Sequence, residues 1–141
     1  MTPTFPLPTI DETTRPYWEA ARRGELRLQR CRGCGSYQHF PGNLCSACGS
    51  ADLEWAATSG RGVVYSFVVV HRTTIPGFTG RVPYAVAWIE LDDGPTARVL
   101  SDLVETDVGK LRIGDPVEVV FDPVSPEATV PRFRTVPAAS A

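Results

Sequence analysis

The chain has 141 residues, which is enough for one ordinary domain or for two small units that share an interface. Hydrophobic residues make up 43% of the sequence, as in a typical globular protein, and no apolar run approaches the length that crosses a bilayer. The formal net charge of −2 at pH 7 argues against a strong attraction to nucleic acid or to an anionic membrane.

The N-terminal segment, residues 1–24, is predicted to be extended at first and then helical. Its early prolines remove backbone donors and disfavour a helix before residue 13. A short helix is expected over residues 14–23, because Thr14 can cap it, Pro16 suits its first turn and Gly24 can end it.

One face of this expected helix is apolar. Tyr17, Ala20, Ala21 and Gly24 recur at the spacing of a helical stripe, and Trp18 falls beside them. A helix of this length is not stable alone in water, so the stripe must be covered. We expect it to pack on its own chain; the alternative is that Tyr17 and Trp18 dock on a partner.

The four cysteines of the sequence stand in two copies of one short pattern, C-x-x-C-G. Cys31 and Cys34 form the first pair, and Cys45 and Cys48 form the second. Two tight turns of this kind place four thiolates around one tetrahedral zinc ion. The glycine after each pair can adopt a positive φ, which turns backbone N–H groups toward the sulfurs. We therefore predict one zinc site within a ribbon over residues 25–58.

Two disulfides, a C-x-x-C redox pair and an iron site are the alternatives to zinc. The N-terminus has no basic region followed by an apolar run, so a cytoplasmic location and reduced thiols are expected. Two symmetric pairs argue against a redox function, and iron stays open because it accepts the same four sulfurs. Four protein ligands leave no coordination position for water, so the zinc is expected to be structural.

Alternating residues predict strands over 25–30 and 53–57, on either side of the cysteine pairs. A short hairpin with a turn at Gly42 and Asn43 is expected to fill the gap between the pairs. Residues 59–62, with the sequence Ser-Gly-Arg-Gly, then mark the boundary to the next unit.

The remainder of the chain is β-rich and is predicted to form a closed barrel over residues 59–136, followed by a tail at 137–141. Valine-rich, aromatic and alternating runs predict five strands, and closure of a small sheet removes its exposed edges. A five-stranded OB fold is the first choice of architecture, and an SH3-like barrel is the second. The expected strands cover residues 63–71, 84–91, 96–100, 117–121 and 132–136, with a hairpin turn at 92–95.

Few residues of the sequence suit catalysis. His39 is expected to be exposed or beside the metal, and His71 ends the longest strand, where it can touch a ligand at the barrel mouth. Asp92 and Asp93 look like a carboxylate pair, but the turn around them explains both. The sequence has no nucleophile motif and no phosphate-binding glycine loop, so the chain alone does not look like an enzyme.

A barrel beside a zinc ribbon also raises the hypothesis of a single-stranded nucleic-acid-binding module. Tyr65, Phe67, Tyr84 and Trp88 lie on expected strands and are able to stack bases. We favour the alternative that they form barrel core, with Tyr65 and Phe67 sharing one face of their strand. The acidic net charge also counts against phosphate binding.

Several short sequence motifs, in the order in which they occur, make the chain resemble one family of stand-alone proteins in which a zinc ribbon is joined to an OB fold. Together they cover most of the chain, from Tyr17 to Arg134. This resemblance implies a mainly β protein with a short N-terminal helix, a rubredoxin-like zinc ribbon and a C-terminal OB fold. Besides the two cysteine pairs, the motifs are Tyr17-Trp18-Glu19, Gly24-Glu25-Leu26, Ser59-Gly60-Arg61-Gly62, Val70-His71-Arg72, Pro76-Gly77-Phe78, Pro83-Tyr84, Ile113-Gly114-Asp115-Pro116-Val117 and Pro131-Arg132-Phe133-Arg134.

Members of that family accompany thiolases and related acyl-CoA enzymes, so the resemblance implies a non-catalytic accessory subunit. The implied partner is a thiolase-fold enzyme, such as a thiolase, a ketosynthase-like enzyme or a side-chain aldolase, with a hotdog-fold hydratase as an alternative. The partner then supplies the catalytic residues, and this chain helps to hold the acyl-CoA. An independent acyl-CoA-modifying enzyme is the least favoured alternative.

Contacts with acyl-CoA or with the partner are expected in two places. Loops at a barrel mouth often carry ligands, so the loop 72–83 is the first, with His71, Arg72 and Phe78 as candidates. Tyr17 and Trp18 on the N-terminal helix are the second. No membrane partner is expected, and nucleic acid is the less favoured partner.

Overall fold

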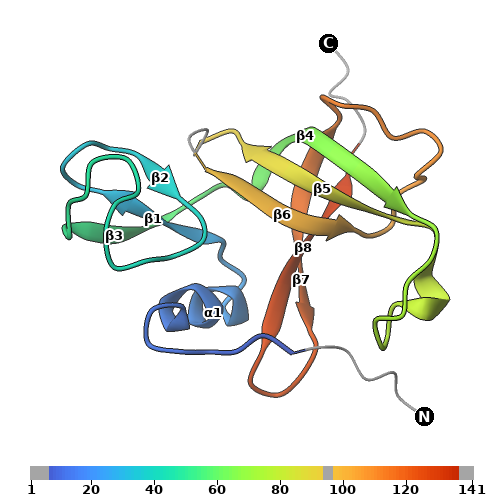
Figure 1. The fold of residues 1–141 in the computed structure, drawn as a ribbon, viewed down its shortest axis with the longest axis horizontal. Helices are drawn as coiled ribbons and strands as arrows, with labels where there is room; N and C mark the ends of the chain where they lie inside the picture. Colours follow the sequence, from blue (N-terminus) through green and yellow to red (C-terminus); the bar gives the residue numbers. More distant parts are fainter. Residues whose placement is uncertain (1–6, 94–96, 137–141) are drawn as a thin grey trace.

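The computed structural model describes residues 7–93 and 97–136. An N-terminal helix and a small three-stranded sheet come first in the chain, and a barrel follows (Figure 1). No helix in the described residues is long and apolar enough to cross a membrane. The elements are α1 (Arg15–Arg22), β1 (Arg27–Cys31), β2 (Tyr37–Gln38), β3 (Leu53–Ala57), β4 (Arg61–Val70), the 3-10 helix η1 (Thr79–Arg81), β5 (Tyr84–Leu91), β6 (Arg98–Leu103), β7 (Pro116–Pro123) and β8 (Thr129–Thr135).

The start of α1 differs from the expected cap. The Thr14 side chain makes no capping hydrogen bond to the helix. Instead, the Asp11 carboxylate accepts hydrogen bonds from the backbone N–H of Thr14 at 2.9 Å and from its hydroxyl at 3.1 Å. The prediction of Thr14 as the side-chain cap is therefore wrong, because Asp11 engages its hydroxyl. The other two signals are confirmed, since Pro16 lies in the first turn and Gly24, with a φ of 77°, follows the helix end.

The apolar face of α1 packs on its own chain, which confirms the first of the two interpretations. Tyr17 is 6% exposed, and Ala20 and Ala21 are almost completely buried. Burial raises the pKa of the Tyr17 phenol far above its usual value. Because the helix contacts β1 of the small sheet and β7 and β8 of the barrel, it links the two sheets.

The small sheet is antiparallel and has the order β2-β1-β3. β1 and β3 are the two strands expected on either side of the cysteine pairs, and both are confirmed. The expected hairpin between the pairs is wrong, because β2 pairs with β1 and the chain merely bends at Asn43 and Leu44.

Two buried glutamine side chains hold the segment after β2 against β1. Gln38 Nε2 donates to Gln29 Oε1 at 2.8 Å, and Gln38 Oε1 accepts from the Ser46 N–H at 2.8 Å. Gln29 Oε1 also accepts from the Gly42 N–H at 2.8 Å, and Gln29 Nε2 donates to the Gly42 carbonyl at 2.9 Å. These amide groups satisfy backbone atoms of Gly42 and Ser46 in a segment that forms no strand.

The five remaining strands close into a barrel in the order β4-β5-β6-β8-β7 (Figure 1). Neighbouring strands are antiparallel except at the seam between β6 and β8, which is parallel and pairs Leu103 with Phe133. A closed five-stranded barrel with this connectivity is an OB fold. The first-choice architecture is therefore confirmed over the SH3-like alternative.

The strand limits differ modestly from the expected ones. β5 matches its expected range, whereas β6 continues past residue 100 and both β7 and β8 begin earlier than expected. Within the turn after β5, the Asp93 carboxylate accepts a hydrogen bond from the Ser59 N–H at 2.7 Å, so the turn is tied to the segment between the sheets. Four parts of the predictions lie outside the described residues: the extended residues 1–6, the second half of the turn at 92–95, the expected strand start at 96 and the tail at 137–141.

A bulge in β4 changes which aromatic side chains face the core. The register between β4 and β5 shifts between Val64 and Ser66. Because the bulge adds one residue, Tyr65 is 46% exposed while Phe67 packs against the core, and the predicted common face of these two residues is wrong. Trp88 on β5 is 45% exposed. The interpretation as barrel core is therefore wrong for Tyr65 and Trp88 and confirmed for Phe67.

One hydrophobic core runs across the helix, the ribbon and the barrel. Its members include Tyr17 of α1, Leu28 of β1 and Phe133 of β8. Packing therefore joins the ribbon to the barrel, in addition to the chain that links them. The division of the chain at residues 24, 58 and 136 stays a prediction.

Candidate metal centre and surface sites

The four cysteine sulfurs converge at one end of the ribbon. All four Sγ atoms lie within 4.8 Å of one another, and the Cys31–Cys48 and Cys34–Cys45 pairs are 3.6 Å apart. A disulfide bond measures about 2.05 Å, whereas two sulfurs on one tetrahedral zinc ion, each at about 2.3 Å from it, are separated by about 3.8 Å. All four thiols are free, so the geometry favours a shared ion over two disulfides.

Each cysteine pair forms the same tight turn. The sulfur of its first cysteine accepts a hydrogen bond from the N–H of the second, at 3.4 Å in both turns. The glycine that follows donates to the carbonyl of the first cysteine, at 2.8 Å for Gly35 and 2.9 Å for Gly49. These glycines have φ values of 78° and 80°, which confirms the positive φ expected from their place in the pattern. The N–H donors offset thiolate charge and orient the sulfurs.

The donor set fits one structural metal ion. Cys31 and Cys45 are buried, and Cys34 and Cys48 are exposed, so half of the donor set faces the interior. Four thiolates fill a tetrahedral shell and leave no position for water. The centre is therefore suited to holding the ribbon together and unsuited to activating a water molecule.

The predicted ligand loop follows β4 and contains η1, on the opposite side of the molecule from the ribbon (Figure 1). Phe78 is half-buried, with its ring 5.4 Å from that of Tyr84 and the Arg81 guanidinium 5.4 Å over it. Exposed His71 and Arg72 present basic groups beside several hydroxyls. An open hollow of about 670 Å³ is lined here by His71, Arg72, Thr73, Thr74, Ile75, Thr79 and Val82.

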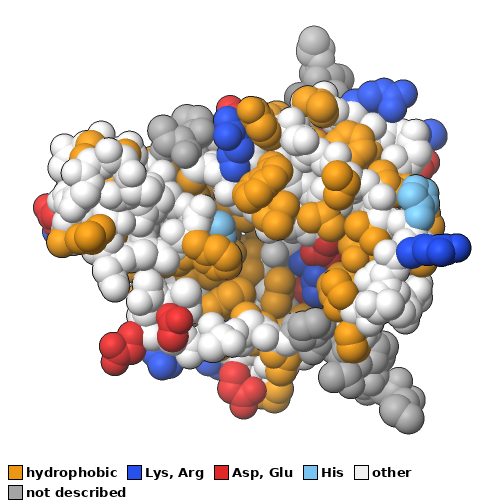
Figure 2. Space-filling model, in the orientation of Figure 1, with side chains coloured by type: hydrophobic (Ala, Val, Ile, Leu, Met, Phe, Trp, Pro, Cys, Tyr) orange, Lys and Arg blue, Asp and Glu red, His pale blue; other side chains and the backbone are white. Residues whose placement is uncertain are grey.

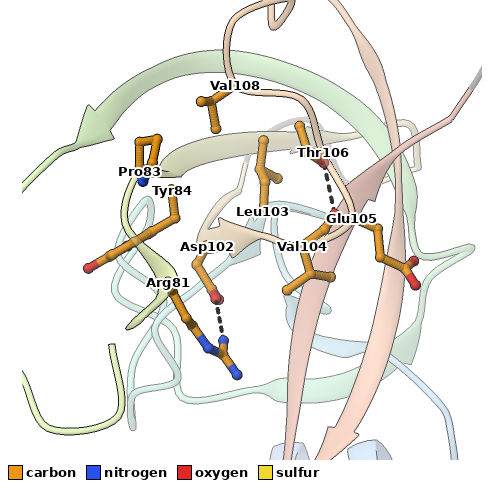
Figure 3. A pocket seen from close by; sticks show the side chains of 9 residues that line it. All are labelled: Arg81, Pro83, Tyr84, Asp102, Leu103, Val104, Glu105, Thr106 and Val108. Carbon is orange, nitrogen blue, oxygen red and sulfur yellow. Dashed lines mark hydrogen bonds and ion pairs between the residues drawn. The ribbon is translucent and has the colours of Figure 1, made fainter. Parts of the chain in front are cut away.

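A second hollow, of about 290 Å³, lies beside an ion-pair network that the sequence analysis did not identify (Figure 3). Arg81 and Asp102 point toward each other there, with 3.7 Å between their nearest charged atoms. Asp102 also accepts two hydrogen bonds, at 2.8 and 2.7 Å, from Arg132, which is 5% exposed. Arg132 Nε donates to Asp122 at 2.8 Å. The network joins β6, β7 and β8, so its evident effect is to close the barrel.

The sequence did carry a signal for this network. Arg132 stands between Pro131 and Phe133 in a short strand, and an arginine in a buried strand position requires a carboxylate partner. The partner Asp102 is 30 residues away, so the sequence pattern alone did not identify it.

A third hollow, of about 270 Å³, lies between the ribbon and the barrel, and we call it the cleft. Its lining consists of His39, Tyr65, Trp88 and Arg98. The His39 ring packs 5.1 Å from that of Tyr17 and stacks on Phe40 at 5.0 Å. Burial lowers the pKa of His39 to about 4. The expectation of an exposed or metal-adjacent His39 is wrong, because its ring lies among aromatic side chains.

The predicted contact residues fall in separate places. Tyr17 is buried, and the half-buried Trp18 has an Nε1 with no hydrogen-bond partner in the described part of the chain. α1 lies on the opposite side of the molecule from the loop that carries His71 and Arg72 (Figure 1). The structure therefore does not bring the two predicted groups into one site, and their ligand contacts stay predictions.

Two family models match adjacent parts of the chain. Residues 18–54 match the rubredoxin-like zinc ribbon domain of ChsH2, and residues 55–122 match the C-terminal OB-fold domain of ChsH2. Together with the four converging sulfurs, the first match identifies the centre as one structural zinc site.

Two relatives resemble the chain over most of its length. A DUF35 domain-containing scaffold protein from Methanothermobacter thermautotrophicus is 36% identical over 120 residues, which cover 84% of this chain and 87% of that protein. A probable enoyl-CoA hydratase alpha subunit from Thermomonospora curvata is 38% identical over 129 residues, which cover 92% of this chain but 39% of that protein. The chain therefore spans about two fifths of that hydratase subunit.

A solved structure described as an Ltp2-ChsH2(DUF35) aldolase contains a chain of the same fold. The two chains superpose with a TM-score of 0.79 at 38% sequence identity. The similarity covers 91% of this chain and 98% of the other.

Proposed function

The chain belongs to the ChsH2 family of joined zinc-ribbon and OB-fold domains, and we propose that it is a non-catalytic accessory subunit of an acyl-CoA-processing complex. The proposed partner is a thiolase-fold enzyme, such as a thiolase, a ketosynthase-like enzyme or a side-chain aldolase. The match to the chain of the Ltp2-ChsH2(DUF35) aldolase carries this proposal, because it covers 98% of that chain. Similarity over nearly the whole length supports the same kind of assembly.

The chemistry of the described side chains supports a partner that supplies the catalytic groups. The zinc site takes up all four thiols, so no cysteine is left as a nucleophile. His39 has a pKa of about 4 and is therefore a weak general base at neutral pH. The Asp102 carboxylate is already held by Arg132.

We place the acyl-CoA beside the loop after β4. Arg72 and His71 are exposed there, and a guanidinium is well suited to the phosphates of a CoA thioester. Arg72→Ala should raise the KM for acyl-CoA of the complex severalfold while kcat and assembly stay unchanged. Arg22→Ala on α1 is the matched control. An equal effect of both variants on the KM would show that the acyl-CoA does not bind specifically beside this loop.

A second candidate partner is a hotdog-fold enoyl-CoA hydratase. The observation in its favour is the probable enoyl-CoA hydratase alpha subunit that is 38% identical to this chain. In either assembly the role of this chain is accessory. We also propose a cytoplasmic location, because reducing compartments keep cysteines in the thiol form that binds zinc.

Affinity purification from the native cell tests the proposed function. A tagged chain should retain a thiolase-fold acyl-CoA enzyme at a defined stoichiometry, identified by mass spectrometry. Recovery of a hydratase subunit alone would favour the second candidate partner. A chain that retains neither enzyme, yet binds an oligonucleotide tightly and in a salt-sensitive way, would overturn both in favour of a nucleic-acid-binding module.

A further inference from the structure

Large apolar side chains are exposed on one face of the barrel. Of nine such side chains in the described part of the chain, four lie on the outer face of β4, β5 and β6, and these are Tyr65, Val68, Trp88 and Leu100. The register places Trp88 beside Leu100 on one neighbour and Ser66 on the other. Figure 2 shows hydrophobic side chains gathered over these strands, next to a hollow. The solvent side of an antiparallel sheet is usually polar, so this cluster is unusual for a free surface.

The ribbon extends this surface across the cleft. Phe40 is 75% exposed and stacks on His39, which lines the cleft together with Tyr65 and Trp88. We call Phe40 and the four barrel side chains the aromatic face. Two units of the chain thus contribute to one apolar surface.

Arg98 supplies the formal charge in the lining of the cleft. Its guanidinium carbon lies 3.7 Å from the centre of the Tyr65 ring. A stacked guanidinium is weakly hydrated and tolerates burial, and it can pair with a carboxylate on an incoming surface. The contrast is the surface of β7 and β8, where Arg134 forms ion pairs with Glu118 at 2.7 Å and Glu105 at 2.9 Å. The aromatic face itself consists of uncharged side chains, with Arg98 beside it in the lining of the cleft.

The size and composition of the aromatic face suit a folded protein. Its five side chains are between 45% and 75% exposed, whereas monomeric soluble proteins rarely expose large contiguous apolar patches. A stable interface takes about 800 Å² from each partner, so this face can form the apolar centre of one. Tyrosine, tryptophan, phenylalanine and arginine are also enriched in interfaces. An oligonucleotide fits less well, because phosphate binding needs several cations and the cleft offers Arg98.

We propose that the aromatic face is the surface on which the acyl-CoA enzyme docks, and this inference rests on the proposed function. Trp88 and Phe40 are its anchors from the barrel and the ribbon. The enzyme presents an apolar surface to them, with a carboxylate placed to meet Arg98.

Binding of variants to the enzyme that co-purifies with the wild-type chain tests this inference. Trp88→Ala and Phe40→Ser should each raise the Kd by about 30-fold, as expected for anchors of an interface. Leu7→Ser is the matched control, because Leu7 is also exposed but lies in the N-terminal segment, and its Kd should stay within twofold of wild type. The two variants lie in different units, and zinc content and unfolding midpoint verify that each is folded.

Three outcomes would overturn the inference in distinguishable ways. Wild-type affinity in both variants places the docking surface elsewhere and leaves the proposed function intact. If the wild-type chain retains no acyl-CoA enzyme, both the proposed function and the docking inference are wrong. Self-association of the purified chain that Trp88→Ala abolishes would make a second copy the occupant of the face.

Discussion

The cysteine end of the ribbon and the interior of the barrel are buried with different side chains. The ribbon end encloses two thiols and the amides of Gln29 and Gln38. The barrel encloses Phe133, Ile89 and Leu91, each at most 1% exposed. A few polar groups contribute little hydrophobic free energy, so the ribbon end depends on its ion, whereas the barrel depends on burial. The comparison teaches that one chain of this size can combine a metal-dependent unit with a barrel that depends on burial, joined through a shared hydrophobic core.

Loss of the metal should produce the largest difference in stability between the ribbon end and the barrel. In Cys45→Ser, or after chelation, the amides of β1 and β3 should lose their protection from hydrogen exchange while those of β4 to β8 keep most of theirs. Zinc binding contributes about 10 kcal/mol or more in small zinc domains, which exceeds what the ribbon end can gain by burial. Ser46→Ala, beside the same cysteine, is the control and should leave the pattern unchanged. Ribbon protection that survives without metal would break the comparison.

A cavity in the barrel should produce the next largest effect. Phe133 is fully buried at the seam, so Phe133→Ala should lower the free energy of unfolding by about 3–5 kcal/mol in urea titrations. Zinc affinity of the folded variant should stay near that of wild type. Val68→Ala, at a position 61% exposed, should change stability by less than about 0.5 kcal/mol. Equal losses in both variants would show that burial does not dominate the barrel.

Two arginines on β8 sharpen the comparison between interior and surface. Arg132 is buried against Asp102 and Asp122, so Arg132→Ala removes the shorter ion pair of each carboxylate, leaves Asp102 with the longer contact to Arg81, and should cost about 3 kcal/mol. The side chain of Arg134 is 42% exposed, and its solvated ion pairs should make Arg134→Ala far less damaging. Thermal unfolding of the two variants measures the difference. A larger loss in Arg134→Ala than in Arg132→Ala would contradict the role assigned to the seam network.

The pH dependence of the free energy of unfolding should depend on His39, the ribbon residue that faces the barrel. The pKa of His39 falls from 6.5 in the unfolded chain to about 4 in the folded chain. Below pH 6.5 His39 binds a proton in the unfolded state but not in the folded state, so the free energy of unfolding decreases as the pH falls toward 4. Between pH 7.5 and 5.5, wild type should lose about 1.4 kcal/mol relative to His39→Gln, which also subtracts any effect of acid on the zinc site. Parallel pH profiles of the two proteins would contradict the burial of a neutral His39.

Features set by neighbouring residues were predictable from the sequence. The metal centre depends on two local turns, so the spacing of Cys31, Cys34, Cys45 and Cys48 was sufficient to predict it. Most barrel strands followed from alternation and turns, and β5 matched its expected limits. Closure could be expected because a small sheet otherwise leaves edges exposed.

Features set by distant partners were not predictable in the same way. The bulge that turns Tyr65 outward depends on pairing between β4 and β5, and a pattern of period two does not reveal the extra residue. Gln29 and Gln38 replace a hairpin through contacts between separate strands. The aromatic face was not predicted for the same reason, since aromatic residues in strands are more often core than surface.

Reconstitution of activity tests the central claim of an accessory subunit most directly. Steady-state turnover of acyl-CoA is measured for the purified chain, for the enzyme that co-purifies with it, and for the two mixed at equal concentration. The account predicts no turnover by the chain alone and a kcat/KM of the mixture at least about tenfold above that of the enzyme alone, which corresponds to 1.4 kcal/mol of transition-state stabilisation. Turnover by the isolated chain, or an enzyme whose kcat/KM and stability do not change when the chain is added, would contradict it.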